Sequence, residues 1–266
     1  MALLVRWAAS GENAVVFSDE EFQALVEERG NTIKALKLEL ASRGFGSRFC
    51  LRLLHAGEHL EVGDDVVIVP PLVLKMVKLA FLPADEGRDQ EFLDACQDGD
   101  LQAVANSLHQ HQDPNTADIE GYTGLHAAAQ NGDLELVRLL LEAEASCNQA
   151  CSGGGTALHD AAANGHLEMV RLLLQAGATC DHAVVLGPVA GWTSLHWAAR
   201  CGYLDVVQLL VEFGATRDAR TRDGETPVEL AAKHGFQDVV DFLNVVELAA
   251  KHAPAKRLKR EHVSES

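Results

Sequence analysis

The sequence predicts an α+β protein in which a small domain of strands and helices precedes an all-α solenoid of about five helical repeats. The chain has 266 residues, enough for two domains, and 47% of them are apolar, which suits a chain that folds around a core. Short strand-like segments dominate its beginning, whereas the remainder repeats itself about every 33 residues. We therefore expect domains at residues 1–83 and 91–253, a linker at 84–90, and a basic, disordered tail at 254–266.

Apolar patterning in the first domain predicts five strands and one helix. The helix is expected over Thr32–Ala41, with Ile33, Leu36 and Leu40 facing inward, and the segment Asp19–Arg29 lengthens the approach to it. The first two strands form a hairpin across a polar turn. The strands are expected at Leu3–Trp7, Ala14–Phe17, Cys50–Leu54, Gly57–Leu60 and Val73–Leu79.

This order of elements, together with the run Leu53-x-x-Ala56-Gly57-x-x-Leu60, resembles a ubiquitin-like β-grasp domain. The resemblance implies a recognition patch, and its sheet positions match Leu54, Lys75 and Val77. The turn Ser10–Asn13 lacks the apolar tip of that patch, and no paired glycines follow Leu79–Pro83 for conjugation. We therefore expect a built-in module and not a tag that is attached to other proteins.

A four-residue pattern recurs through the second domain and marks the start of each repeat. Its copies begin 33, 37 and 33 residues apart, and glycines keep the same spacing. Each unit predicts a polar turn, a helix opened by the threonine hydroxyl, a glycine stop and a second helix. A first unit at Glu91–Asp118 lacks its leading turn. The copies are Thr123-Gly-Leu-His126, Thr156-Ala-Leu-His159, Thr193-Ser-Leu-His196 and Thr226-Pro-Val-Glu229, and the glycines are Gly99, Gly132, Gly165, Gly202 and Gly235.

These units resemble the ankyrin family, whose repeat of about 33 residues carries the pattern T-P-L-H-x-A. The resemblance covers residues 91–250 and implies a stack of helix pairs. It also implies that the imidazoles of His126, His159 and His196 hydrogen-bond backbone groups between adjacent turns. Val228 and Glu229 replace the usual Leu-His in the last unit, as suits a terminal unit whose outer side meets water.

Glu144 stands where the later units have Gly177 and Gly214. If that position is left-handed, a non-glycine residue there costs about 1 kcal/mol. We therefore expect replacement of Glu144 with glycine to raise the melting temperature.

Charge and cysteine usage exclude several classes of function. Acidic residues outnumber basic ones by 39 to 22, and the net charge of −17 argues against nucleic acids and anionic membranes as partners. Residues 84–190 hold 17 of the acidic groups and 3 of the basic ones. Scattered cysteines and the lack of an apolar leader predict a cytoplasmic protein without disulfides. The run Lys256–Arg260 fits either a nuclear import signal or a solvated end.

Catalytic and metal-binding motifs are not found in the sequence, and we expect no enzyme, metal or cofactor. Ser152–Thr156 is rich in glycine but lacks the Gly-Lys-Ser/Thr of a phosphate loop. Cys147, Cys151, Cys180 and His182 could ligate zinc. However, Cys147 and Cys180 fall at equivalent positions of adjacent repeats and should stand about 10 Å apart, too far for one ion.

The ankyrin resemblance implies a concave groove that binds a partner through turn tips and first helices. Tyr122, Trp192 and Arg200 are the expected anchors, because aromatic and arginine side chains dominate interface energetics. In the alternative, Trp192 packs against a neighbouring turn, and Trp197 is expected in the framework or the floor of the groove. A four-residue insertion makes Ala183–Ala190 an apolar loop, which either contacts the partner or folds back onto the stack. The expected partner-binding residues are Ile119, Glu120, Tyr122, Gln130, Asn131, Trp192, Arg200, Cys201, Arg222, Glu225, Lys233 and His234.

Two functions follow as hypotheses. The first is a monomeric, non-catalytic adaptor whose groove binds an unidentified protein while the ubiquitin-like module positions another. The alternative is a ubiquitin-pathway adaptor that presents groove-bound cargo to a proteasome or ligase through Leu54, Lys75 and Val77.

Overall fold

The structure is a computed structural model. It describes residues 3–7, 13–29, 33–43, 51–55, 58–59, 72–78, 81 and 84–252. The predicted tail at 254–266, with its basic run Lys256–Arg260, and most of the turn Ser10–Asn13 lie outside the described residues.

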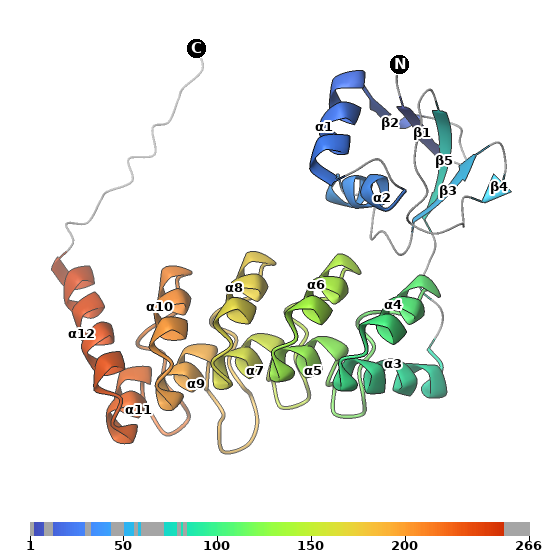
Figure 1. The fold of residues 1–266 in the computed structure, drawn as a ribbon. Coiled ribbons are helices and arrows are strands. Elements are labelled where there is room, and N and C mark those ends of the chain that lie inside the picture. The colour runs from blue at the N-terminus through green and yellow to red at the C-terminus, as the bar shows by residue number, and fades with distance from the viewer. Residues whose placement is uncertain are drawn as a thin grey trace, which may run out of the picture.

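Five strands of the first domain form one mixed sheet in the order β2-β1-β5-β3-β4. Strand β1 pairs antiparallel with β2 and parallel with β5, and β3 pairs antiparallel with both β5 and β4 (Figure 1). Every strand that the sequence predicts is present, with ends shifted by at most a few residues. The strands are β1 Leu3–Trp7, β2 Asn13–Phe17, β3 Leu51–His55, β4 Glu58–His59 and β5 Leu72–Lys78.

Two helices, α1 (Asp19–Arg29) and α2 (Ile33–Ser42), follow the hairpin. The amphipathic helix is confirmed, because Leu36 and Leu40 of α2 are fully buried. Helix α1 corrects the prediction that Asp19–Arg29 only lengthens the approach. Its start is a reciprocal cap: the Ser18 N–H donates to Glu21 Oε2 (2.8 Å) and the Glu21 N–H donates to Ser18 Oγ (3.2 Å).

The described residues from 84 onward form five helix pairs. Helix α3 begins at Glu86, inside the segment 84–90 that the sequence predicts as a linker, because the Asp85 carboxylate accepts the Arg88 N–H and caps the helix. The helices are α3 Glu86–Asp98, α4 Leu101–His109, α5 Gly124–Asn131, α6 Leu134–Glu142, α7 Ala157–Ala163, α8 Leu167–Gln175, α9 Ser194–Cys201, α10 Leu204–Glu212, α11 Pro227–His234 and α12 Gln237–His252.

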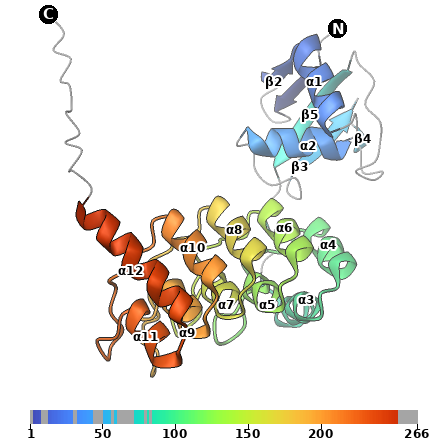
Figure 2. The same ribbon diagram turned by 60° about the vertical axis from the view of Figure 1, so that its left-hand side comes forward.

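The pairs stack side by side in two rows (Figures 1 and 2). The first helices α3, α5, α7, α9 and α11 contact one another in sequence, and the second helices form the neighbouring row. One continuous apolar core runs through the stack from Phe92 to Leu243. Alanine pairs such as Ala128 and Ala129 are fully buried between first helices, where their small side chains allow close packing.

Neighbouring pairs also interlock where a first helix ends. Gly165 has a φ of +73°, and a Cβ atom at this glycine would lie 2.7 Å from the Tyr203 ring of the next repeat. The close approach and the left-handed backbone both require glycine.

Glu144 has a φ of +69° and is therefore left-handed, as the sequence analysis supposed. His111 (φ +67°) occupies the equivalent position one repeat earlier. Both repeats therefore have a non-glycine residue at the turn after the second helix, where the left-handed backbone is less favourable for a residue with a Cβ atom.

Candidate functional site

The threonine–histidine pairs hold the turns of the stack in place. In the second repeat, the Thr123 N–H donates to His126 Nδ1 (3.1 Å), so this ring nitrogen carries no proton in the neutral imidazole. The proton then sits on Nε2, which lies 3.2 Å from the Gly155 carbonyl oxygen of the following turn. His196 repeats this arrangement with the Ala219 carbonyl at 3.1 Å. The backbone role predicted for these two histidines is confirmed.

His159 differs from the other two. Its Nδ1 accepts the Thr156 N–H (3.1 Å), but its buried Nε2 has no hydrogen-bond partner among the described residues. The carbonyl of Trp192, at the position corresponding to Gly155, accepts the Val184 N–H of the inserted loop (2.9 Å). Burial, aided by the neighbouring His182, lowers the pKa of His159 to about 4. The imidazole is therefore neutral and structural at neutral pH.

The turn tips are joined by a ladder of backbone hydrogen bonds. The Ser152 N–H donates to the Glu120 carbonyl (2.8 Å), and the Val185 N–H donates to the Gly153 carbonyl (3.0 Å). The Arg222 N–H donates to the Ala190 carbonyl (2.8 Å). These bonds fix successive tips relative to one another. We call the exposed parts of these tips and of the first helices α3, α5, α7, α9 and α11 the turn-and-helix face.

Most of the predicted partner-binding residues lie exposed on this face. Ile119 is 99% exposed at its turn tip, and Tyr122 is 40% exposed. Lys233 and Glu225 form an ion pair (2.7 Å), and the Asn131 side chain donates to the Gln97 carbonyl (2.9 Å). Cys201 and Glu225 are half-buried, and the exposed members are Ile119, Glu120, Tyr122, Gln130, Asn131, Arg200, Arg222, Lys233 and His234.

Trp192 is not the exposed anchor of the first interpretation but packs into the structure, as the alternative supposed, because only 8% of it is accessible. Its ring packs 4.7 Å from the Trp197 ring, centroid to centroid. The Arg200 guanidinium covers both rings, 5.6 Å from Trp192 and 5.8 Å from Trp197. Trp192 thus supports Arg200 from below, and its replacement by alanine would leave a cavity and lower stability.

The inserted loop Ala183–Ala190 combines the two interpretations that the sequence left open. Val184 is buried and its backbone pairs with Trp192 and Gly191, so part of the loop folds back onto the stack. Val185 and Leu186 are 63% and 61% exposed, so the loop tip adds apolar surface to the turn-and-helix face.

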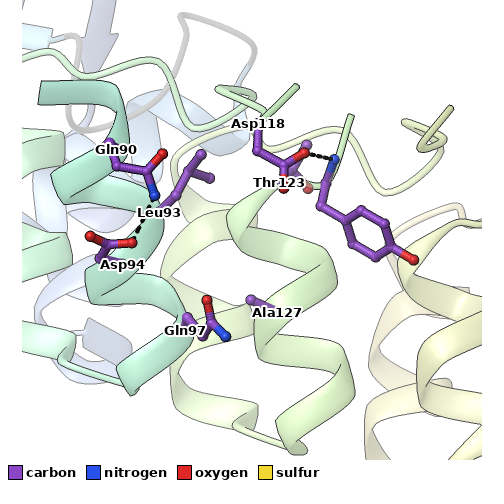
Figure 3. Close-up of a pocket in the computed structure, with 8 residues that line it drawn as sticks. Gln90, Leu93, Asp94, Gln97, Asp118, Thr123 and Ala127 are labelled. Atoms are coloured by element: carbon purple, nitrogen blue, oxygen red, sulfur yellow. Dashed lines mark hydrogen bonds between the residues drawn. The ribbon is translucent and has the colours of Figure 1, made fainter. Parts of the chain in front are cut away.

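A shallow hollow of about 80 Å³ opens on this face between the first two repeats (Figure 3). Asp118 shapes its rim, since its Oδ1 accepts the N–H groups of Glu120 (2.9 Å) and Tyr122 (2.8 Å). On the α3 side, the Gln90 amide donates to Asp94 Oδ1 (2.8 Å). The lining residues are Gln90, Leu93, Asp94, Gln97, Asp118, Tyr122, Thr123 and Ala127. Sequence analysis missed the members of α3, which precede the first threonine pattern.

Three of the four metal-capable residues make other contacts. The Cys147 and Cys180 thiols point to carbonyl oxygens of the next repeat, those of Ala176 (3.5 Å) and Phe213 (3.7 Å). The His182 ring lies edge-on to His159. Within the described residues, no group of three or more His, Cys, Asp or Glu side chains could hold a metal ion.

Asp160 is a residue of this face that sequence reasoning missed. It lies on α7 in the variable position of the T-x-L-H-x-A pattern, where other repeats have Ala127, Trp197 and Leu230. The signal was present in the sequence, because Asp160 is the charged member among the four repeats that carry the threonine pattern; the first repeat, which lacks the pattern, has Asp94 at the equivalent position. Burial raises the pKa of the Asp160 carboxyl to about 7.

Comparison with protein families agrees with this geometry. A model described as ankyrin repeats in three copies matches residues 92–184, and a second, for ankyrin repeats in many copies, matches residues 158–211 and 195–243. Together they span residues 92–243 and reach into all five helix pairs. This chain contains ankyrin repeats. A search of curated proteins found no match.

Ankyrin repeats indicate a role in protein–protein interaction and imply protein partners. The family is typically non-catalytic. In the described part of the chain, no helix is long and apolar enough to cross a lipid bilayer.

Proposed function

We propose that this ankyrin-repeat chain is a non-catalytic adaptor that binds a protein partner on its turn-and-helix face. The ladder of backbone bonds between turn tips carries the proposal most directly, because it holds exposed side chains from successive repeats as one rigid surface. Tyr122 and Arg200 project from this surface with aromatic and guanidinium groups, the types that contribute most to interfaces.

Capture of partner proteins by variants of the turn-and-helix face, compared with control variants, tests this function. Tyr122→Ala combined with Gln130→Ala and Arg200→Ala should lose the partners that the unaltered chain captures, because the three side chains lie on three different parts of the face. A matched control, Glu135→Ala with Arg138→Ala, changes exposed residues of the second helix α6 and should keep them. Equal capture by both variants would contradict the proposal.

We also propose, as a second candidate, that the first domain is a ubiquitin-like module that links groove-bound cargo to a proteasome or ligase. The sheet order supports it, since a β-grasp fold places its first and last strands as a parallel central pair, as β1 and β5 are. The register sets Leu54 opposite Lys75, and Val77 lies two residues along the same strand.

Capture of proteasomal or ligase subunits is the readout for this second candidate. Leu54→Ala should remove such subunits, and Lys78→Ala at the end of β5 should retain them. Subunits that remain bound to both variants, or that never bind the full chain, would count against a ubiquitin-pathway role.

A further inference from the structure

Asp160 is placed where a charge is unfavourable. It lies on the first helix α7, between Ala127 of α5 and Trp197 of α9 at the equivalent positions of the neighbouring repeats. Asp94, its counterpart in the first repeat, is exposed and accepts a hydrogen bond from Gln90. Asp160 is instead partly buried by the helices on either side.

The Asp160 carboxylate also lacks a hydrogen-bond donor or cation that would offset its loss of hydration. Among the residues that the structure describes, none donates a hydrogen bond to it or places a cation within 4.0 Å of it. Burial alone accounts for the raised pKa of its carboxyl group, with no opposing contribution from a nearby cation. The carboxylate oxygens are not among the fully buried side-chain atoms that lack a partner, so they reach the surface, where a ligand can approach them. A charged or hydrogen-bonding partner would stabilise such a partly buried carboxylate, and none of the described residues supplies one.

The guanidinium of Arg200, on the next first helix, is engaged by aromatic rings. Arg200 is one helix away, but its guanidinium lies over the rings of Trp192 and Trp197. Two positions of the Asp160 repeat are small where its neighbours have large side chains: Gly155 stands in place of Tyr122 and Trp192, and Ala163 stands in place of Gln130 and Arg200. Tyr122 stands on the preceding turn, where burial and then the charges of Cys151 and Asp160 raise the pKa of its phenol.

This set of groups has the chemistry of a receptor for a planar cation. An arginine side chain offers a flat guanidinium that stacks on aromatic rings and forms two parallel hydrogen bonds with one carboxylate. Lysine lacks the flat face and the paired donors. We propose that Asp160 binds the guanidinium group of an arginine in the protein partner, with Tyr122 and Trp197 as the aromatic walls. The inference rests on the adaptor function and names the partner's chemistry.

The charge of the surrounding repeats favours the same partner. Residues 84–190 carry 17 acidic and 3 basic side chains, so the first three repeats attract a basic segment before contact. Ile119, Val185 and Leu186 add exposed apolar surface along the turn tips on that side. The proposed occupant is therefore an extended segment with an arginine at its centre and apolar residues beside it.

Nuclear magnetic resonance titration of the full chain tests the proposal. The probe is the capped peptide acetyl-Gly-Gly-Arg-Gly-Gly-amide, and the matched probe replaces arginine with citrulline, which keeps the shape and removes the charge. The arginine peptide should shift the Asp160 and Trp197 signals saturably at concentrations up to about 10 mM. The citrulline peptide should bind at least about tenfold more weakly. This arm uses the unaltered chain and so does not depend on the folding of a variant.

Two variants complete the test. Asp160→Asn should weaken binding of the arginine peptide at least about tenfold, because the neutral amide cannot pair with guanidinium. Glu135→Gln removes one charge from an exposed site on α6 and should leave affinity within about twofold. Equal shifts with both peptides, no saturable shift, or equal loss in both variants would overturn the proposal.

The adaptor function can fail separately. If Tyr122→Ala, Gln130→Ala and Arg200→Ala together abolish partner capture while Asp160→Asn retains it, the arginine inference is wrong and the adaptor function stands. If the arginine peptide binds as expected but partner capture is unchanged by all substitutions on the turn-and-helix face, Asp160 binds guanidinium and the adaptor function assigned to this face is wrong.

Discussion

At the scale of single residues, Asp160 makes the folded protein less stable as pH rises, which is the opposite of the usual effect of an aspartate. Its folded-state pKa is raised to about 7 from an ordinary value of 3.8, so the folded protein holds the proton more tightly than the unfolded chain. The free energy of unfolding therefore falls as pH rises from about 4 to about 7 through this group. The loss persists at higher pH, where the partly buried carboxylate is ionised.

Asp160→Asn should consequently stabilise the protein at pH 8, by about 2 kcal/mol once solvent contact is allowed for, and have little effect near pH 4. Urea unfolding of the two proteins at both pH values measures the difference. Asp94→Asn is the matched control at the equivalent, exposed position and should change stability little at either pH. A destabilised Asp160→Asn protein at pH 8 would show that the carboxylate has a partner in the fold.

Glu144 is the second residue that lowers stability. Glu144→Gly should raise the unfolding free energy by about 1 kcal/mol, because glycine adopts a φ of +69° without a Cβ clash. The corresponding rise in melting temperature is about 2–4 °C. Glu144→Ala removes the same charge but keeps the Cβ, so it should bring no such gain. Equal effects of the two substitutions would attribute the change to charge instead of backbone conformation.

At the scale of elements, the caps of the first helices couple the fold to pH. Burial lowers the pKa of His126, His159 and His196, so the unfolded chain takes up protons that the folded chain resists. Stability is therefore fully present above pH 6.5 and is lost as pH falls toward the folded-state values.

His159, with its pKa at about 4, should account for about 3 kcal/mol of the stability lost between pH 7 and pH 4. His159→Gln should flatten this pH dependence while lowering stability at pH 7. The measurement is the unfolding free energy of both proteins across that range. A slope unchanged by the substitution would show that other groups control acid unfolding.

The contact between Gly165 and Tyr203 offers a separate test of helix stacking. Gly165→Ala and Gly177→Ala both place a Cβ on a left-handed backbone (φ +73° and +93°), but only the first meets a neighbour, the Tyr203 ring. Gly177→Ala should cost about 1 kcal/mol, and Gly165→Ala should cost about 1 kcal/mol more. Thermal unfolding of the two variants gives the comparison, and equal losses would mean that the ring moves aside freely.

Elements with strong local signals could be predicted from sequence, and those without them could not. The threonine–histidine pattern and its glycines predicted the helix pairs from α5 onward, since cap, stop and periodicity agree there. Helix α1 and the start of α3 were missed, although Ser18 with Glu21 and Asp85 provide caps. Both lie in strongly charged segments whose apolar periodicity is weak.

At the scale of the whole molecule, repetition made the binding face predictable as a region but not in detail. Aligned positions located the exposed residues such as Ile119, Tyr122 and Arg200, because every repeat presents the same positions to solvent. Burial of Trp192 depends on Trp197 and on the inserted loop, which are particular to one repeat. Such contacts between repeats cannot be deduced from one repeat's own pattern.

The uneven distribution of charge along the stack predicts the orientation of a bound segment. Acidic groups dominate residues 84–190, whereas Arg200, Arg222 and Lys233 lie on the last two repeats. A bound segment should therefore run with its basic part over the first three repeats and its acidic part over the last two.

Site-specific photocrosslinking tests the central claim, that a partner occupies the turn-and-helix face. One photoreactive residue is placed at Gln130 on α5 and another at Arg138 on α6, both exposed. The account predicts that the partner is crosslinked from position 130 and not from position 138. Crosslinking from position 138 alone, or equally from both positions, would contradict it.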